Sequence, residues 1–372
     1  MPDNRNPNPD ELKKSKFDPN DRNRVKQPAD AYLTQLPSDI LRGEIGKKWL
    51  SPEDQYNLSR VSCGLYTPLK NLASKHVHAF LTHVVRGEKA QVEAMIQRDP
   101  RLLLEKMQVK DEAGRTIYGT AYQIALGAKD VSPFPENKIE EMAEMLERYL
   151  AEHFGEEERN KQYNEQFPEG FEKQEEARRK SDSFELNKVF AAIKKDKTTG
   201  LAEAKKAVAE FQNYLENQIE DVITTGYHFN EALFQEALKL YDEHYNDFGG
   251  FDSAKNRLVA IKLIGFIERF FPANLAQAMC DGIGRVVNVK KMLTRGKLLD
   301  DKKTPFFDPN LGVSHFVYSY YGAGLWVDGW ASPILLVDVS KLMSSKNNNL
   351  IKRQTIVTKR EEPKKQSSRV IQ

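Results

Sequence analysis

The sequence predicts a mainly α-helical fold with little strand, on three observations. Apolar residues recur at intervals of three and four along most of the chain, which is the spacing of one face of an amphipathic helix. Apolar residues make up 40% and charged residues 30% of the 372 residues, as in a polar globular protein. The chain is also longer than a single core usually grows, so we expect two or three packed units.

The bulk composition argues against several classes of partner and site. With a net charge of +2 and a pI near 8.2, the chain has no general excess of positive charge, so no nucleic-acid partner is expected. Cys63 and Cys280 are far apart and lack CxxC spacing, which favours a reducing compartment over a disulfide framework or a cysteine zinc site. Neither a cofactor nor a metal is expected.

The absence of long apolar runs indicates the expected compartment. Residues 1–30 contain no continuous apolar run, and a secretory signal peptide needs one. No stretch of the chain is long and apolar enough to predict a transmembrane helix. We therefore expect a soluble protein without a transmembrane segment.

The two ends of the chain are expected to be flexible. Residues 1–31 combine Pro, Asn and charged residues with almost no large apolar groups, and they cannot bury enough surface to offset chain entropy. This composition predicts a disordered arm. Residues 345–372 carry more Lys and Arg than Asp and Glu, which predicts a basic flexible tail.

Residues 32–73 hold the most distinctive pattern. It opens with Leu36-Pro37 and continues with apolar residues at helical spacing. A helix start follows, in which Ser51 fits the N-cap and Pro52 lies in the first turn, where its missing N–H is not needed. A further apolar face begins with the Leu-Ser-Arg-Val-Ser-Cys segment at 58–63. The pattern predicts short helices with more apolar side chains than so small a unit can bury.

This pattern resembles the F-box, whose members share the leading Leu-Pro, a short apolar helix and a Leu-Ser-x-Val-Cys-like segment. The resemblance implies a three-helix module that docks on the Skp subunit of cullin-RING ubiquitin ligases. The residues that would contact Skp are Leu36, Pro37, Ile40, Leu41, Ile45, Leu58, Val61, Leu65 and Leu69. Each fully buried Leu or Ile contributes about 1.5 to 3 kcal/mol, so a few such anchors are enough for tight binding. The alternative is that these helices pack onto the body of the same chain.

Residues 74–155 contain two passages that each suggest a pair of helices, and both resemble ankyrin repeats. In the second passage, residues 120–125 read Thr-Ala-Tyr-Gln-Ile-Ala where ankyrin repeats carry Thr-Pro-Leu-His-x-Ala. Ala121 and Gln123 depart from that motif, so the resemblance implies a short, degenerate array. Because repeats need neighbours to close their cores, we expect these helices to lean on other parts of the chain.

Two separated blocks, residues 109–130 and 268–284, resemble segments of effector proteins that intracellular bacteria secrete through type IV systems. The resemblance implies export without a signal peptide into the cytoplasm of a eukaryotic host cell. Skp and cullin would be available there.

Residues 156–344 are expected to form a helical carboxy-terminal domain. The Lys- and Glu-rich stretch 156–180 predicts a solvated helix or linker at its start. Apolar residues at helical spacing predict further helices around 211–222 and 233–241. Residues 334–339 are apolar except for Asp338 and predict a short strand near the end.

The histidines and cysteines form no recognisable catalytic or metal-binding pattern. Cys280, His315 and Asp328 have the residue types of a thiol triad, but no local signature supports one, and the apolar surroundings of Cys280 favour burial. His78 and His83 are five apart, which does not place them on one helix face as metal ligands.

The predicted function is therefore not enzymatic. We expect a substrate-receptor subunit of a ubiquitin ligase, which binds Skp and presents an unknown host protein for ubiquitination. One alternative is an ankyrin-like protein that sequesters a host partner without a ligase. The other is an effector enzyme with an unrecognised site in residues 250–345.

Overall fold

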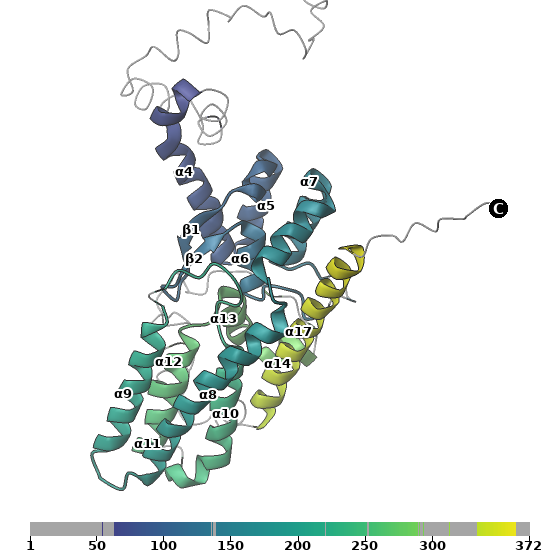
Figure 1. The fold of residues 1–372 in the computed structure, drawn as a ribbon. Coiled ribbons are helices and arrows are strands. Elements are labelled where there is room, and N and C mark those ends of the chain that lie inside the picture. The colour runs from purple at the N-terminus through teal and green to yellow at the C-terminus, as the bar shows by residue number, and fades with distance from the viewer. Residues whose placement is uncertain are drawn as a thin grey trace, which may run out of the picture. The chain divides into compact units, whose positions relative to one another are not determined.

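The computed structural model describes residue Asp54 and residues 63–134, 136, 139–219, 221–250, 253–288, 290, 293, 312 and 333–361. The chain divides into two compact units, Met1–His76 and Val77–Gln372, and almost all described residues belong to the second. Among the interpretable residues 71% are helical and 5% lie in strands, so the mainly α prediction is confirmed. Figure 1 labels the elements.

The first helices of the second unit follow one another through tight turns. Helix α4 (Cys63–Val85) crosses the division between the units, and helix α5 (Lys89–Arg98) follows it after a turn at Gly87, where φ is 70°. Val92 and Ile96, one helical turn apart, point from α5 into the core and are fully buried. The 3-10 helix η3 (Pro100–Leu104) comes next, with Pro at its first position, where no N–H is required.

A two-stranded antiparallel hairpin precedes the next helices. Strand β1 (Met107–Lys110) pairs with strand β2 (Thr116–Gly119). The carboxylate of Asp111 closes the turn by accepting from the backbone N–H groups of Ala113 and Arg115, each at 3.0 Å. The sequence pattern does not predict this hairpin, because each strand has only four residues and buries one or two of them.

Helices α6 and α7 form the pair that follows the hairpin. Thr120 caps α6 (Ala121–Gly127) in a reciprocal capping box with Gln123, which satisfies N–H groups that the first turn cannot pair. Helix α7 (Met142–Gln166) packs on α6 and bends at Gly155, whose φ of 83° is open to glycine but strained for other residues. The helical character predicted for both passages in 74–155 is confirmed.

The rest of the second unit is also helical. Its further elements are α8 (Phe171–Lys195), α9 (Ala202–Asn217), α10 (Glu231–His244), the 3-10 helix η5 (Tyr245–Phe248), α11 (Ala254–Arg257), the π-helix η6 (Leu258–Ile264), α12 (Gly265–Glu268), α13 (Ala273–Cys280), α14 (Ile283–Asn288) and α17 (Pro333–Glu361). Helices α8, α9 and α10 lie alongside the run from α11 to α12 in Figure 1. The helix predicted around 233–241 corresponds to α10. The one predicted around 211–222 corresponds to α9, which ends at Asn217, so Ile219 and Val222 lie beyond it.

The core between these helices is built from their predicted apolar faces. Phe211 and Leu215 on α9 and Leu233 and Ala237 on α10 are all buried in it, together with side chains from η6, α13 and α17. Aromatic rings interlock there, and the Phe271 ring meets that of Phe234 edge to face with 4.8 Å between centroids.

Two predictions about the end of the chain are wrong. Residues 334–339 are helical, because the apolar spacing continues through Leu342 and Met343, which are buried on the same side of α17. Residues 345–361 are not a flexible tail, since they belong to α17 and bury Lys346 and Leu350. Residues 362–372 lie outside the described part of the chain, as does the predicted arm 1–31.

The expected boundary at 155/156 does not separate two compact units. Helix α7 runs across it, and one unit extends on both sides. The stretch 156–180, predicted as a solvated helix or linker, is helical in α7 and α8 with a turn at 167–170. It is only partly solvated, because Arg159, Gln162 and Tyr163 are buried.

Candidate functional site

Only two of the nine residues expected to contact Skp belong to the described part of the chain. Seven of them lie outside the described residues: Leu36, Pro37, Ile40, Leu41, Ile45, Leu58 and Val61. The other two, Leu65 and Leu69, belong to helix α4, without described side chains. All nine fall within the range of the first compact unit, Met1–His76.

The two blocks at 109–130 and 268–284 meet in the fold. The Nδ2 atom of Asn274, in the second block, donates to the carbonyl oxygen of Lys129, in the first, at 2.8 Å across 145 residues of chain. Lys129 has a φ of 49°, a left-handed conformation that costs a residue with a side chain about 1 kcal/mol or more. The surrounding contacts hold it there.

The side chain of Lys129 reaches two further helices. Its Nζ atom lies 3.1 Å from Glu231 Oε2 at the start of α10 and 3.0 Å from Asn347 Oδ1 on α17. The same Nζ atom is 4.2 Å from the ring centroid of Tyr227, a cation–π distance. Lys346 of α17 donates to the Lys129 carbonyl oxygen at 3.1 Å. Lys129 therefore ties α10, α13 and α17 to the end of α6.

A second, partly buried polar cluster joins α17 to α7. The Glu144 carboxylate accepts from Asn349 Nδ2 at 3.1 Å and from Arg353 Nη2 at 2.9 Å. Arg353 also pairs with Glu147. Burial raises the pKa of the neighbouring Tyr122, and the positive charge of Arg353 opposes that rise. Asn349 and Arg353 both bond to Glu144 across the two helices, which is typical of a structural network.

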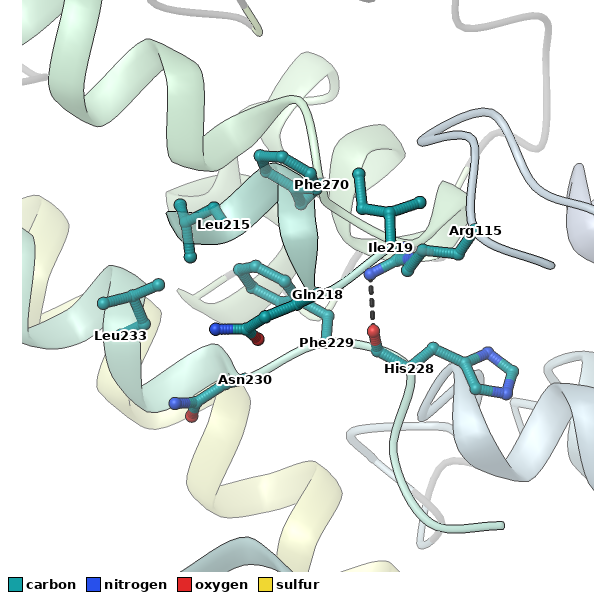
Figure 2. Close-up of a pocket in the computed structure, with 9 residues that line it drawn as sticks. All are labelled: Arg115, Leu215, Gln218, Ile219, His228, Phe229, Asn230, Leu233 and Phe270. Atoms are coloured by element: carbon teal, nitrogen blue, oxygen red, sulfur yellow. Dashed lines mark hydrogen bonds between the residues drawn. The ribbon is translucent and has the colours of Figure 1, made fainter. Parts of the chain in front are cut away.

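A small pocket lies where the two blocks adjoin (Figure 2). Arg115 from the hairpin, His228 and Asn230 before α10, and Phe270 after α12 line it. The guanidinium donates from Nη1 to the His228 carbonyl oxygen at 2.6 Å, and its Nη2 lies 2.7 Å from Asp111 Oδ2. The space of about 40 Å³ has room for a few water molecules but not for a metabolite. We therefore interpret this pocket as part of the packing between the two blocks and not as a ligand site.

Cys280 has the surroundings of a packing residue. It ends helix α13 and is packed against the core. Burial raises the pKa of its thiol to about 12, and the nearby Asp281 and Glu268 carboxylates add to the rise. A nucleophilic cysteine needs the opposite shift. Its proposed triad partners, His315 and Asp328, lie outside the described residues.

An open hollow lies between α9 and the helical run that contains η6. It holds about 420 Å³, and an adjoining hollow of about 230 Å³ extends it toward the start of α9. We call the two together the α9–η6 groove. Its walls include Lys205, Ala209 and Gln212 on α9, facing Leu258, Lys262 and Phe266 on the other side.

The shape of the groove depends on a π-helical wall. The wider turns of η6 bury Leu263 and Ile264 and leave Lys262 exposed. Gln212 Nε2 crosses from α9 and donates to the Lys262 carbonyl oxygen at 2.7 Å, which fixes the distance between the walls. Short π-helical segments are rare and often accompany functional sites.

The charged residues that line the α9–η6 groove are all basic. They are Lys205, Arg257 and Lys262, and among the described residues no acidic side chain lines either hollow. Beyond one end, Glu216 pairs with Arg269 at 3.2 Å, and this guanidinium lies 4.5 Å from the Phe266 ring centroid. The groove is thus a cationic channel with an apolar floor.

Sequence reasoning missed this groove. The only signal was a second stripe on α9, in which Lys205, Ala209 and Gln212 repeat at helical spacing beside the core stripe. Such a stripe is usual on solvated helices, so it indicates a groove only once the facing wall is known.

The described residues offer neither a metal-binding group nor a membrane-spanning helix. No three or more His, Cys, Asp or Glu side chains in this part of the chain are grouped to hold a metal ion. None of the helices built from the described residues combines the length and the apolar character needed to span a bilayer.

The comparisons with known proteins leave the chain without an assigned relative. No family model matches the sequence, and neither the curated proteins nor the solved structures contain a significant match.

Proposed function

We propose that the protein is an F-box-type substrate receptor, which binds Skp through its amino-terminal unit and holds a target protein on its helical body. The observation that carries the proposal is the F-box-like pattern, from Leu36-Pro37 to the Leu-Ser-Arg-Val-Ser-Cys segment. The pattern lies within the range of the first unit, Met1–His76, and the helical body belongs to the second, Val77–Gln372. A receptor needs two such parts, because one must hold the ligase while another holds the target.

The arrangement of the body supports the second half of the proposal. A hairpin, a Thr-capped helix and a second helix that packs on it follow one another through β1, β2, α6 and α7, the order of elements in an ankyrin unit. The open α9–η6 groove offers an additional surface for a polypeptide. The chemistry would belong to the recruited ligase, and this chain would act by raising the effective concentration of the target beside it.

The two blocks at 109–130 and 268–284 support delivery into a eukaryotic host cell by a type IV system. The two blocks meet at Lys129 and Asn274 in this chain. Delivery itself is proposed from the resemblance. It can be tested by fusing the chain to a reporter enzyme that acts only in host cytoplasm.

The adaptor proposal is tested by recovery of Skp from eukaryotic lysate on the immobilised full chain. We expect wild type to retain Skp and cullin, and Leu36→Ala with Pro37→Ala to lose most of both. Leu104→Ala, at an exposed leucine of the body, is the matched control and should retain them. If the double variant retains as much Skp as wild type, the adaptor proposal fails and sequestration of a host partner takes its place.

The enzyme alternative concerns residues 250–345. It would gain support if Skp is never recovered and if Cys280→Ala or His315→Ala abolishes a cellular phenotype in a protein that remains folded. The raised pKa of Cys280 makes that outcome unexpected for the thiol.

A further inference from the structure

We propose that the α9–η6 groove binds an acidic amphipathic helix of the target protein. The inference rests on the proposed function, because it takes the groove as the surface that receives the target. It names the chemistry of that target, which the sequence alone does not indicate.

The size of the groove suits a short helix. From Leu201 to Gln212 along α9 the groove extends about 16 Å, at about 1.5 Å per residue, the length of about three helical turns. Its apolar surface comes from Ala209 and Ile261, with the small exposed parts of Leu258 and Phe266, and it offers contact to the inward face of such a helix. A helix forms its own backbone hydrogen bonds, so the groove needs to provide only side-chain contacts.

The charges of the groove select the sign of the ligand. Lys205 and Lys262 stand on opposite walls and are both exposed, so carboxylates on the two flanks of a bound helix could each meet one. Arg257 extends the positive field toward the second hollow. A basic helix would bring like charges together without any acidic lining residue to offset them, so the groove discriminates by repulsion as well as attraction.

The concave form favours a peptide over an anionic membrane. The cations flank an apolar groove about three helical turns long. The hydrogen bond from Gln212 to the Lys262 carbonyl oxygen joins its two walls. A flat lipid surface would contact the rims without filling the floor. Membrane binding is therefore a competing outcome of the test.

The experiment measures fluorescence anisotropy of a labelled helix-forming peptide titrated with the full chain. The probe has Leu at helical spacing on one face and Glu elsewhere, and a second probe replaces each Glu with Lys. We expect the Glu peptide to bind, to weaken as salt is raised, and to bind at least about tenfold more tightly than the Lys peptide.

Variants locate the binding in the groove. Lys205→Glu with Lys262→Glu should weaken the Glu peptide at least about tenfold and strengthen the Lys peptide, a reversal that a misfolded protein would not give. Ala209→Trp, which keeps the charge but fills the channel, should also weaken binding. Lys173→Glu with Lys206→Glu makes the same change in net charge at exposed positions outside the groove lining and should change affinity less than about twofold.

The proposal is overturned if the Glu peptide does not bind, if both peptides bind alike, or if the groove variants match the control. Binding to phosphatidylserine vesicles that depends on Lys205 and Lys262, without peptide binding, would overturn it in favour of a membrane surface. Recovery of Skp separates this failure from that of the adaptor proposal. The groove variants should still retain Skp, and the Leu36 and Pro37 variant should still bind the Glu peptide.

Discussion

The Lys129 ammonium and the Glu231 carboxylate form an ion pair at 3.1 Å, and both residues are at least nine-tenths buried. The pair connects the end of α6 to the start of α10. Removing one partner of a buried pair leaves an unpaired charge in the interior, which typically costs about 3 to 5 kcal/mol.

Lys129→Met or Glu231→Gln should therefore lower the free energy of unfolding by about 3 kcal/mol, measured by urea denaturation followed by circular dichroism. The double variant should lose clearly less than the sum of the two single losses. Lys188→Met, which breaks the exposed pair with Glu185, is the control and should cost less than about 1 kcal/mol. Additive losses from the Lys129 and Glu231 changes would show that the pair is not coupled.

Ending the chain after residue 344 should destabilise the second unit. The truncation removes Lys346, Asn349 and Arg353, and it leaves the Ser132 carbonyl oxygen and the Glu144 carboxylate without the bonds that these side chains donate. We expect a thermal midpoint lower by several degrees or an insoluble chain. Ending the chain after residue 361 keeps all of these contacts. An unchanged midpoint in the shorter truncated chain would mean that the second half of α17 contributes nothing to stability.

Asp196 should make stability depend on pH at the acid end. Hydrogen bonds from Thr198 and from the backbone N–H of Ala204 lower the pKa of its carboxyl to about 2. The ionised form therefore stabilises the fold above the unfolded pKa of about 3.9, and this stabilisation is lost as pH falls toward about 2.

Asp196→Asn should accordingly be less stable than wild type at pH 6, and the difference should shrink at pH 3. Urea denaturation at the two pH values measures it. Asp221→Asn, at an exposed position, should show little difference at either pH. A gap between wild type and Asp196→Asn that is the same at both values would contradict the hydrogen-bonded role of this carboxylate.

Cys280 should react slowly with alkylating agents in the folded chain. With a pKa raised to about 12, only about one thiol in ten thousand is ionised at pH 8, and the thiolate is the reactive form. Iodoacetamide labelling at pH 8, read by peptide mass spectrometry, should modify Cys280 far more slowly in native protein than in urea. Rapid labelling of Cys280 in the native protein would contradict this expectation and support the enzyme alternative.

The sequence predicts those helices whose apolar faces repeat regularly. Leu233, Ala237 and Tyr241 on α10 are spaced as a single buried stripe, so their positions suffice to predict the helix and its core face. The same reasoning fails for α17, whose buried face includes Lys346 and Asn349. Their burial depends on carbonyl groups 217 residues earlier in the chain, which no local pattern contains.

The candidate groove was unpredictable for a related reason. Lys205 and Lys262 are ordinary surface residues within their own helices, and only the packing of α9 against η6 places them on opposite walls. The position of the two lysines across the groove depends on how distant helices pack, and the local spacing of residues does not reveal it.

The most direct test of the adaptor account is calorimetric titration of purified full-length chain with purified Skp. The account predicts a one-to-one complex with a dissociation constant of about 1 μM or tighter, and a loss of at least about tenfold in affinity for Leu36→Ala with Pro37→Ala. Absence of binding at tens of micromolar Skp, or equal affinity of wild type and the double variant, would contradict it.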